Sequence, residues 1–251
     1  MQGALKLAVA AVLVIAGTSA ARADWSASAG FENFRWKEDT SPAVKESGLR
    51  WAFDLTWAQS KQPGLSAEYN IKFYVGNVDY TGSFLGTAVP VSAESHYRGM
   101  VNEVRAVYRA SMWADFVFAG GWDHWKRELS ATQEETFDVL YAKLGTNFNT
   151  TTRQGLIASA GIKYPVYVRE NAHLMELGFD QNPRLRPGRD LSFYGTVGYR
   201  VNPSWDVIAY YDSYRFKQSN MVAVTSGGAS FLVFQPESRM DVVGMKVQHN
   251  F

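Results

Sequence analysis

The 251-residue sequence contains no cysteine, so disulfides cannot hold the fold together. It also lacks a charge excess of either sign, because 25 Lys and Arg residues stand against 24 Asp and Glu residues. A near-neutral chain has no electrostatic footprint for nucleic acid. Beyond residue 23, no stretch reaches the ~18 uncharged apolar residues that a membrane-spanning helix requires. These absences argue against a disulfide scaffold, a nucleic-acid-binding protein and a helical membrane protein.

The N-terminal segment is typical of a secretory signal peptide. Lys6 precedes an uncharged apolar run at 7–17, and residues 21–23 (Ala-Arg-Ala) fit an A-x-A cleavage site. We therefore predict a leader at 1–23 and a mature, exported domain at 24–251. A retained N-terminal anchor is the alternative.

The C-terminal segment has the pattern of a β-strand. Val243, Met245, Val247 and Phe251 take alternate positions, with glycine or polar residues between them. Such alternation predicts a strand with one apolar and one polar face. The segment resembles the C-terminal sorting signal of bacterial outer-membrane β-barrel proteins, although His249, third from the end, departs from it. An ordinary edge strand is the alternative.

The same alternation recurs along the mature chain and predicts ten strands. The clearest example sets Leu49, Trp51 and Phe53 against Arg50 and Asp54. Each predicted strand has ~9–13 residues, the length that a tilted strand needs to cross the hydrocarbon layer. The sixth strand has no clear facing. The ten strands are expected near 25–37, 49–58, 65–75, 98–108, 113–126, 136–145, 155–168, 191–199, 205–216 and 240–251.

The predicted connections alternate in length. The short ones lie at 59–64, 110–112, 147–154 and 202–204, and the long ones at 38–48, 79–97, 127–135, 169–190 and 217–239. Outer-membrane barrels have short periplasmic turns, long outer loops and an even number of strands. The resemblance therefore implies an all-β fold, a transmembrane antiparallel up-and-down β-barrel of ten strands in the bacterial outer membrane. Eight or twelve strands, and a secreted β-sandwich or lipocalin-like barrel, are the alternatives.

In such a barrel the polar face of each strand points into the lumen. Eight strands enclose an interior that side chains fill, whereas sixteen or more leave a water channel. At ten strands we expect the lumen charges to pair, because an unpaired buried charge is costly. A salt-bridged structural plug and a narrow path for ions or small solutes are both open. The predicted lumen charges are Arg50, Asp54, Glu68, Lys72, Glu103, Arg105, Arg109, Asp115, Asp123, Lys163, Arg200 and Lys246.

The histidines do not complete a recognisable catalytic set. Asp123 and His124 are adjacent, so on a strand they point to opposite faces and cannot share one site. His96 and His173 are expected in outer loops, where Ser95 is a neighbour of His96. No His-x-Ser or G-x-S-x-G nucleophile motif is present, and no cluster has zinc or calcium spacing.

Two aspartates could converge at the outer rim. Asp79 is expected at the top of the third strand and Asp212 at the top of the ninth. Omptins, a ten-stranded family of surface proteases, carry aspartates and an Asp-x-His pair in comparable places. Here Asp212 is followed by Ser213 and Tyr214, with no histidine two residues on. We therefore predict no catalytic residue, no metal and no cofactor.

The sequence thus predicts a non-enzymatic outer-membrane protein with a charge-filled narrow lumen, which acts structurally or through its loops. A narrow channel and an omptin-like or lipid-acting surface hydrolase are the alternatives. The expected partners are outer-membrane lipid and lipopolysaccharide, and the barrel-assembly machinery, which would read Val243, Met245, Val247 and Phe251 as an assembly signal. The apolar loop side chains expected to be exposed are Tyr80, Phe84, Tyr97, Leu174, Phe179, Phe231 and Phe234.

Overall fold

The computed structural model describes residues 23–59, 64–83, 89–130, 132–149 and 154–251, and these are mostly β-strand. The leader predicted at 1–23 lies almost wholly outside this part and stays a prediction. No helix of the described part is long and apolar enough to cross a membrane. The long strands are β1 (Ala23–Glu38), β2 (Val44–Gln59), β3 (Leu65–Ser83), β4 (Pro90–Arg109), β5 (Ala114–Ser130), β6 (Gln133–Asn149), β7 (Gly155–Ala172), β10 (Ser192–Asn202), β11 (Trp205–Lys217) and β14 (Ser238–Asn250).

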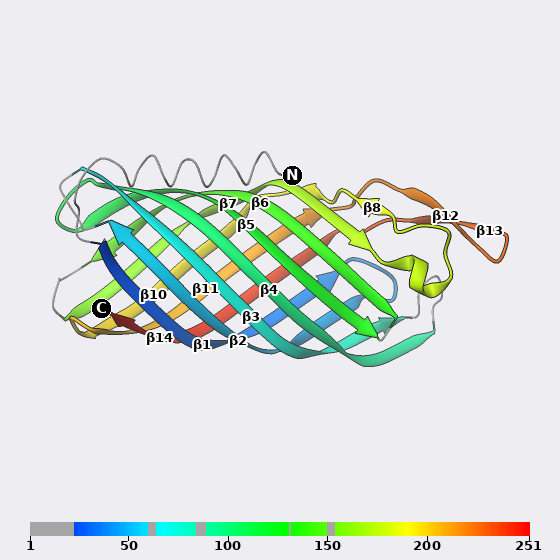
Figure 1. The fold of residues 1–251 in the computed structure, drawn as a ribbon, viewed down its shortest axis with the longest axis horizontal. Coiled ribbons are helices and arrows are strands. Elements are labelled where there is room, and N and C mark those ends of the chain that lie inside the picture. The colour runs from blue at the N-terminus through cyan, green and yellow to red at the C-terminus, as the bar shows by residue number, and fades with distance from the viewer. Residues whose placement is uncertain (1–22, 60–63, 84–88, 131, 150–153) are drawn as a thin grey trace.

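These long strands form a closed antiparallel barrel (Figure 1). Each pairs with its neighbours in chain order, and β1 pairs with both β2 and β14, so the sheet has no free edge. The prediction of an all-β, ten-stranded up-and-down barrel is therefore confirmed. The smaller elements are the 3₁₀ helix η1 (Leu174–Leu177) and the short strands β8 (Arg184–Leu185), β9 (Gly188–Arg189), β12 (Val222–Ser226) and β13 (Ala229–Val233).

The two ends of the barrel differ. One end, here called the turn end, carries the start of β1, the end of β14 and the short connections at 110–113 and 203–204. The other, the loop end, carries the connections at 173–191 and 218–237, and the β12–β13 hairpin projects from it (Figure 1).

The strands reach further toward the loop end than the sequence predicts. The long loops predicted at 38–48, 79–97 and 127–135 are wrong, because β3 and β4 stay paired out to Ser83 and Pro90 and the other two pairs extend similarly. Polar outward positions in these extensions, such as Asn77 and Asp79, have the composition of loops but alternate as strands.

The barrel wall reverses its polarity between the two ends. Toward the turn end, the outward side chains are apolar and exposed, and Trp51 is 61% exposed. Toward the loop end, the outward side chains are polar, and the inward ones are apolar and buried. We call the apolar outward band the belt. It includes Phe31, Leu49, Trp51, Phe53, Leu55, Phe73, Val75, Phe116, Phe118, Leu144, Leu156, Ile162, Phe193, Val197, Val207, Val243, Met245 and Val247.

Candidate functional site

The interior of the barrel at the level of the belt contains a polar cavity of about 670 Å³. Its lining begins at turn-end residues such as Asp24, Pro203 and Asn250, and it ends at Tyr214 and Met240. The cavity therefore opens toward the turn end. Its wall is built from three polar clusters, whose members come from strands far apart in the sequence.

Glu32 of β1 is the centre of the first cluster. Its Oε1 accepts a hydrogen bond from Arg50 Nη2 at 2.6 Å, and its Oε2 accepts from Lys72 Nζ at 2.6 Å and from Tyr210 OH at 2.8 Å. The Tyr210 ring lies across Gly244, where any Cβ would collide with it. Both carboxylate oxygens are thus satisfied, which is the condition for keeping a buried charge.

Glu103 of β4 organises the second cluster in the same way. Its Oε1 accepts from Arg105 Nε at 2.5 Å, and its Oε2 accepts from Tyr141 OH and from Lys143 Nζ, each at 2.7 Å. The Tyr141 ring lies across Gly121, which again has no room for a Cβ. In both clusters a carboxylate is held by two cations and one tyrosine hydroxyl.

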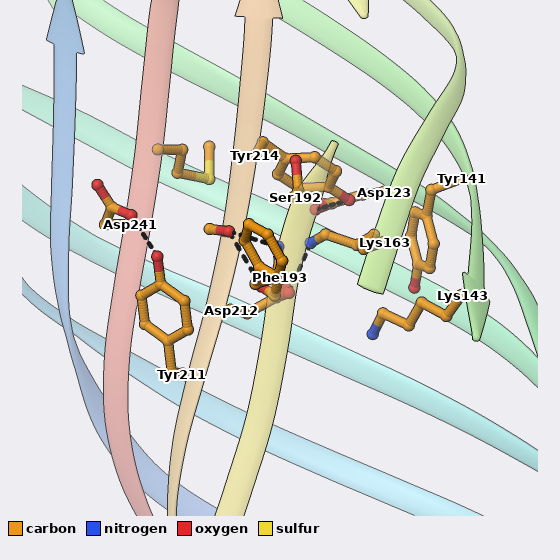
Figure 2. A network of polar contacts seen from close by, with 12 residues as sticks. Asp123, Tyr141, Lys143, Lys163, Ser192, Phe193, Tyr211, Asp212, Tyr214 and Asp241 are labelled. Atoms are coloured by element: carbon orange, nitrogen blue, oxygen red, sulfur yellow. Dashed lines mark hydrogen bonds and ion pairs between the residues drawn. The ribbon is translucent and has the colours of Figure 1, made fainter. Parts of the chain in front are cut away.

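The third cluster joins β7 to β11 across the interior (Figure 2). Lys163 Nζ lies 2.6 Å from Asp212 Oδ1 and 3.4 Å from the centre of the Tyr214 ring. Asp123 accepts hydrogen bonds from Tyr74 at 2.8 Å and from Tyr214 at 3.2 Å. One aspartate is thus held by a cation, and the other by two hydroxyls.

Above the cavity, an aromatic core fills the loop-end half of the barrel. Phe34, Tyr97, Trp125 and Phe137 are each 0% exposed. Trp125 and Phe137 stack with ring centroids 4.8 Å apart, and Phe34 lies 4.6 Å from Tyr97. These rings therefore occupy the middle of the barrel interior at this level.

Beyond the aromatic core, a single guanidinium faces four carboxylates. Arg127 Nη1 lies 3.1 Å from Glu38 and 2.9 Å from Glu135, and its Nε lies 3.1 Å from Glu46. Glu170 is also buried beside them, and its Oε2 has no hydrogen-bond partner among the described residues. This acidic cluster forms the outermost layer inside the barrel.

The two long loops cover that layer and contact each other. Gln235 donates a hydrogen bond to Glu38 at 3.3 Å. Asp180 N donates to Thr225 O at 2.9 Å, and Thr225 N donates to the Asp180 carboxylate at 2.8 Å. The hydrogen bonds that Thr225 donates to the Asp180 carboxylate, first of all from its backbone N–H, hold the pKa of that carboxyl below its ordinary value. In the described part of the chain, three successive layers therefore occupy the loop-end half of the barrel interior: the aromatic core, the acidic cluster and the two loops.

The structure places the predicted lumen charges on inward-facing positions. Nine of them line the cavity: Arg50, Asp54, Glu68, Lys72, Glu103, Arg105, Asp123, Arg200 and Lys246. Lys163 lies fully buried beside Asp212, and Arg109 and Asp115 face each other at 3.6 Å near the turn end. Lys246 lies 3.3 Å from Asp54.

Several residues of these clusters were not anticipated. Glu32 follows the outward-facing Phe31 in the first strand, so the period-2 pattern places Glu32 on the inward face and could have identified it. Lys143 was hidden because β6 is apolar on both faces, with Val139 and Tyr141 inward and Leu140 and Leu144 outward. The residues of the acidic cluster around Arg127 lie in segments that the sequence predicts to be loops.

The two aspartates that could have converged at the outer rim do not meet in the structure. Asp212 lies inside the barrel against Lys163, whereas Asp79 is exposed on the outward face of β3. The two therefore lie on opposite sides of the barrel wall, because Asp79 sits at an outward position of its strand.

The histidines lie apart and have separate partners. His96 belongs to a strand rather than to a loop and contacts Asn77 at 2.6 Å, while Ser95 points inward to Glu46. His124 lies outside, 3.0 Å from Asp138, whereas Asp123 lies inside. Among the described residues, no group of three or more His, Cys, Asp or Glu residues is placed to hold a metal.

His173 has a hydroxyl neighbour, but its ring nitrogen is already engaged. Its Nε2 lies 3.3 Å from Thr136 Oγ1 and 3.0 Å from the Asn171 amide nitrogen. Because the amide nitrogen can only donate, the lone pair of Nε2 is occupied. It cannot at the same time take the proton of Thr136.

The exposure predicted for the apolar loop side chains holds only in part. Tyr97 and Leu174 are buried, the first in the aromatic core and the second under the loops. Phe231 and Phe234 are exposed, and Phe179 packs edge-on against Phe231 with centroids 5.7 Å apart. Tyr80 is half-buried, and Phe84 lies outside the described residues.

The C-terminal strand lies in the wall with its apolar residues outward. Val243, Met245, Val247 and Phe251 are all exposed, and the Phe251 N donates to Trp25 O at 2.9 Å. The last residues therefore complete the barrel closure beside β1.

No protein-family model matches the chain. No curated protein matches it. Among solved structures it is similar to the outer membrane protease OmpT from Escherichia coli, with a TM-score of 0.61 and 10% identity over 94% of this chain and 99% of that one. Neisserial surface protein A also matches, with a TM-score of 0.40 and 13% identity over 90% and 97% of the two chains.

The match to the Escherichia coli structure shows a shared fold. The chain has the fold of bacterial outer-membrane β-barrel proteins, and its belt of exposed apolar side chains is the surface that such a barrel presents to lipid. The predicted outer-membrane location is confirmed. In this class the short turns are periplasmic, and we expect the same orientation here, with the loop end outward.

Proposed function

We propose that the protein is a non-conducting, non-enzymatic outer-membrane barrel that acts through its loop end. The observation that carries this proposal is the filling of the loop-end half of the lumen by the aromatic core and the acidic cluster. A solute that entered the cavity from the turn end would meet Tyr214 and Met240 and could go no further.

Conductance in planar lipid bilayers tests the closed lumen. Refolded protein should give no current steps above those of a protein-free bilayer. A variant that combines Trp125→Gly with Phe137→Gly removes the stacked pair of the aromatic core, and it should also give no steps because the acidic cluster and the loops remain in place. Stable open steps from the unchanged protein would support the narrow channel instead.

The head formed by 173–191 and 218–237 is the surface that supports a role at the cell exterior. Leu232 of β13 is 65% exposed, and no charged residue lies between Lys217 and Glu237. An exposed uncharged apolar hairpin is typical of a contact surface for a partner. Deleting residues 222–233 should abolish binding of a partner to the protein at the cell surface, while the barrel still inserts into the membrane. Unchanged binding of the partner would argue for a structural role alone.

The non-enzymatic part of the proposal rests on the separation of the candidate groups. Each histidine has its own partner, and Asp212 is neutralised by Lys163. The assay is peptidase and acyl-hydrolase turnover by the refolded protein. Turnover that is abolished by His173→Ala or His96→Ala would overturn this part.

Two partners follow from the outer-membrane fold and belong to the same proposal. Lipid and lipopolysaccharide would surround the belt. The barrel-assembly machinery would read the C-terminal apolar positions during insertion.

A further inference from the structure

Four cations form one row across the outward face of the barrel, beyond the belt. In the sheet register Lys37 lies opposite both Lys45 and Arg239, and Arg239 lies opposite Arg215. We call these four residues the basic row. Their strands, β2, β1, β14 and β11, are consecutive in the wall (Figure 1). Like charges on directly opposed residues destabilise a sheet.

Among the described residues, one of the four cations of the basic row has a carboxylate partner. This is Arg215, which lies 2.7 Å from Asp241. Lys37, Lys45 and Arg239 take part in none of the ion pairs found within the described residues, a part of the chain that contains every Asp and Glu of the sequence. Three of the four cations therefore have no carboxylate at ion-pair distance in the described residues, whereas Arg215 is paired with Asp241, which also lies opposite Arg35 in the sheet register.

On the far side of the barrel, outward cations toward the loop end are paired with carboxylates. There Arg98 lies 2.7 Å from Glu128, and Lys126 lies 2.7 Å from Glu134. Arg169 likewise pairs with Asp138. A polar outward surface toward the loop end thus does not by itself require unpaired cations, so the basic row is a local feature.

The height of the basic row matches the headgroup region of a membrane. Arg239 lies four residues beyond Val243, the last belt residue of β14, which is ~13 Å along a strand that rises ~3.3 Å per residue. Because barrel strands tilt by ~35–45°, Arg239 lies ~10 Å beyond the hydrocarbon along the membrane normal, and so does Lys45, which is four residues beyond Leu49 on β2. Arg35, also without an ion pair in the described part, lies between the row and the belt.

A groove of about 310 Å³ runs beside the basic row. On its loop-end side it includes Asp39 and Glu237, each two residues beyond a cation of the row, so the cationic side of the groove faces the belt. Its lining is Lys37, Asp39, Asp190, Arg215, Phe216, Lys217, Glu237, Ser238 and Arg239.

We propose that the basic row binds the phosphate groups of a lipid in the outer leaflet, whose acyl chains lie along the belt. Arginine and lysine together suit phosphate, since the guanidinium binds it through two hydrogen bonds and the ammonium as a point charge. A phosphate placed between Lys37, Lys45 and Arg239 would compensate the repulsion among these three cations. The site lies on the barrel wall and is independent of the loop function proposed above.

Thermal unfolding of the refolded protein in neutral detergent micelles tests the site with three probes. The probes are lipid A carrying its phosphates, enzymatically dephosphorylated lipid A, and inorganic phosphate. Binding to the folded state alone raises the Tm. We expect a rise with phosphorylated lipid A that weakens with added salt, and none with the other two. An equal rise with dephosphorylated lipid A, or a rise with inorganic phosphate alone, would overturn the lipid-phosphate assignment.

Two triple variants assign the effect to the basic row. Lys37→Gln, Lys45→Gln and Arg239→Gln together should abolish the rise. Arg98→Gln, Lys126→Gln and Arg169→Gln remove three outward cations from the far side and should keep it. A full rise in the first variant, or its loss in the second, refutes the proposal. Should the first variant not fold, Arg239→Gln alone should reduce the rise and Arg239→Lys should largely restore it.

Discussion

Arg50 and Glu32 form a 2.6 Å ion pair between adjacent strands, and their side chains are 3% and 0% exposed. Because both side chains are buried, removal of either one would leave the other with an unpaired buried charge. Arg50 also lies over the rings of Phe34 and Tyr74, which ties the ionic cluster to the aromatic core.

Removing one partner of this pair should be strongly destabilising. Glu32→Gln leaves Arg50 and Lys72 without their shared carboxylate and should cost ~3–5 kcal/mol in the free energy of unfolding. Urea unfolding in lipid vesicles measures this change in the free energy of unfolding. Glu94→Gln is the control, because Glu94 is exposed and its carboxylate accepts a hydrogen bond from the exposed Asn77 side chain. An equal, small effect of both changes would show that the cluster contributes little.

The aromatic core should behave like the core of a water-soluble protein. Phe137→Ala should cost ~3–5 kcal/mol because it leaves a cavity against Trp125. Leu144→Ala, on the same strand but facing lipid, should cost less. The same unfolding measurement compares them, and a larger loss for Leu144 would contradict the assignment of the core.

The free-energy cost of a charged substitution on the outward face should depend on its depth in the membrane. Phe53→Arg should cost ~2–4 kcal/mol, whereas Ser47→Arg, on the same face of β2 but beyond the belt, should cost ~0–1 kcal/mol. Folding equilibria in vesicles provide both values. Equal costs would mean that the belt does not face lipid.

Assembly should depend on the last residue. Phe251→Ala should lower the amount of folded, heat-modifiable barrel in the outer membrane while export continues. Trp113→Ala, at another exposed turn-end aromatic, serves as the control. Unchanged insertion of the Phe251 variant would remove the assembly role from that residue.

Docking of the β12–β13 hairpin on the neighbouring loop should depend on pH. Because Thr225 holds the pKa of Asp180 below its ordinary value, the carboxylate contribution is complete above the unfolded value of ~3.9 and is lost as the pH falls through the lower folded value. The rate of hydrogen exchange at the Thr225 amide measures the loss of this docking. Asp180→Asn should accelerate that exchange at neutral pH, and Glu176→Gln should not.

The period-2 pattern was sufficient to predict the fold and the inward facing of the lumen charges, because in the belt polarity alternates strictly. It failed where the barrel leaves the belt. There the wall is polar outside and aromatic inside. The segment 79–97 therefore has the composition of a loop, although most of it is strand. Ion pairs such as Lys163 with Asp212 join strands that meet only in the closed barrel, and no spacing along the chain encodes them.

The reversal of wall polarity means that one continuous sheet folds in two solvents. In the belt half the exterior is matched to hydrocarbon, so burial of apolar area from water gives the interior little stability there, and the ionic clusters must hold it. In the loop-end half the aromatic core is withdrawn from water, and its contribution weakens on cooling, as hydrophobic stabilisation does. Temperature should therefore loosen the outer part of the barrel from both sides of an optimum, while the lipid-embedded part responds mainly to the thickness of the bilayer around it.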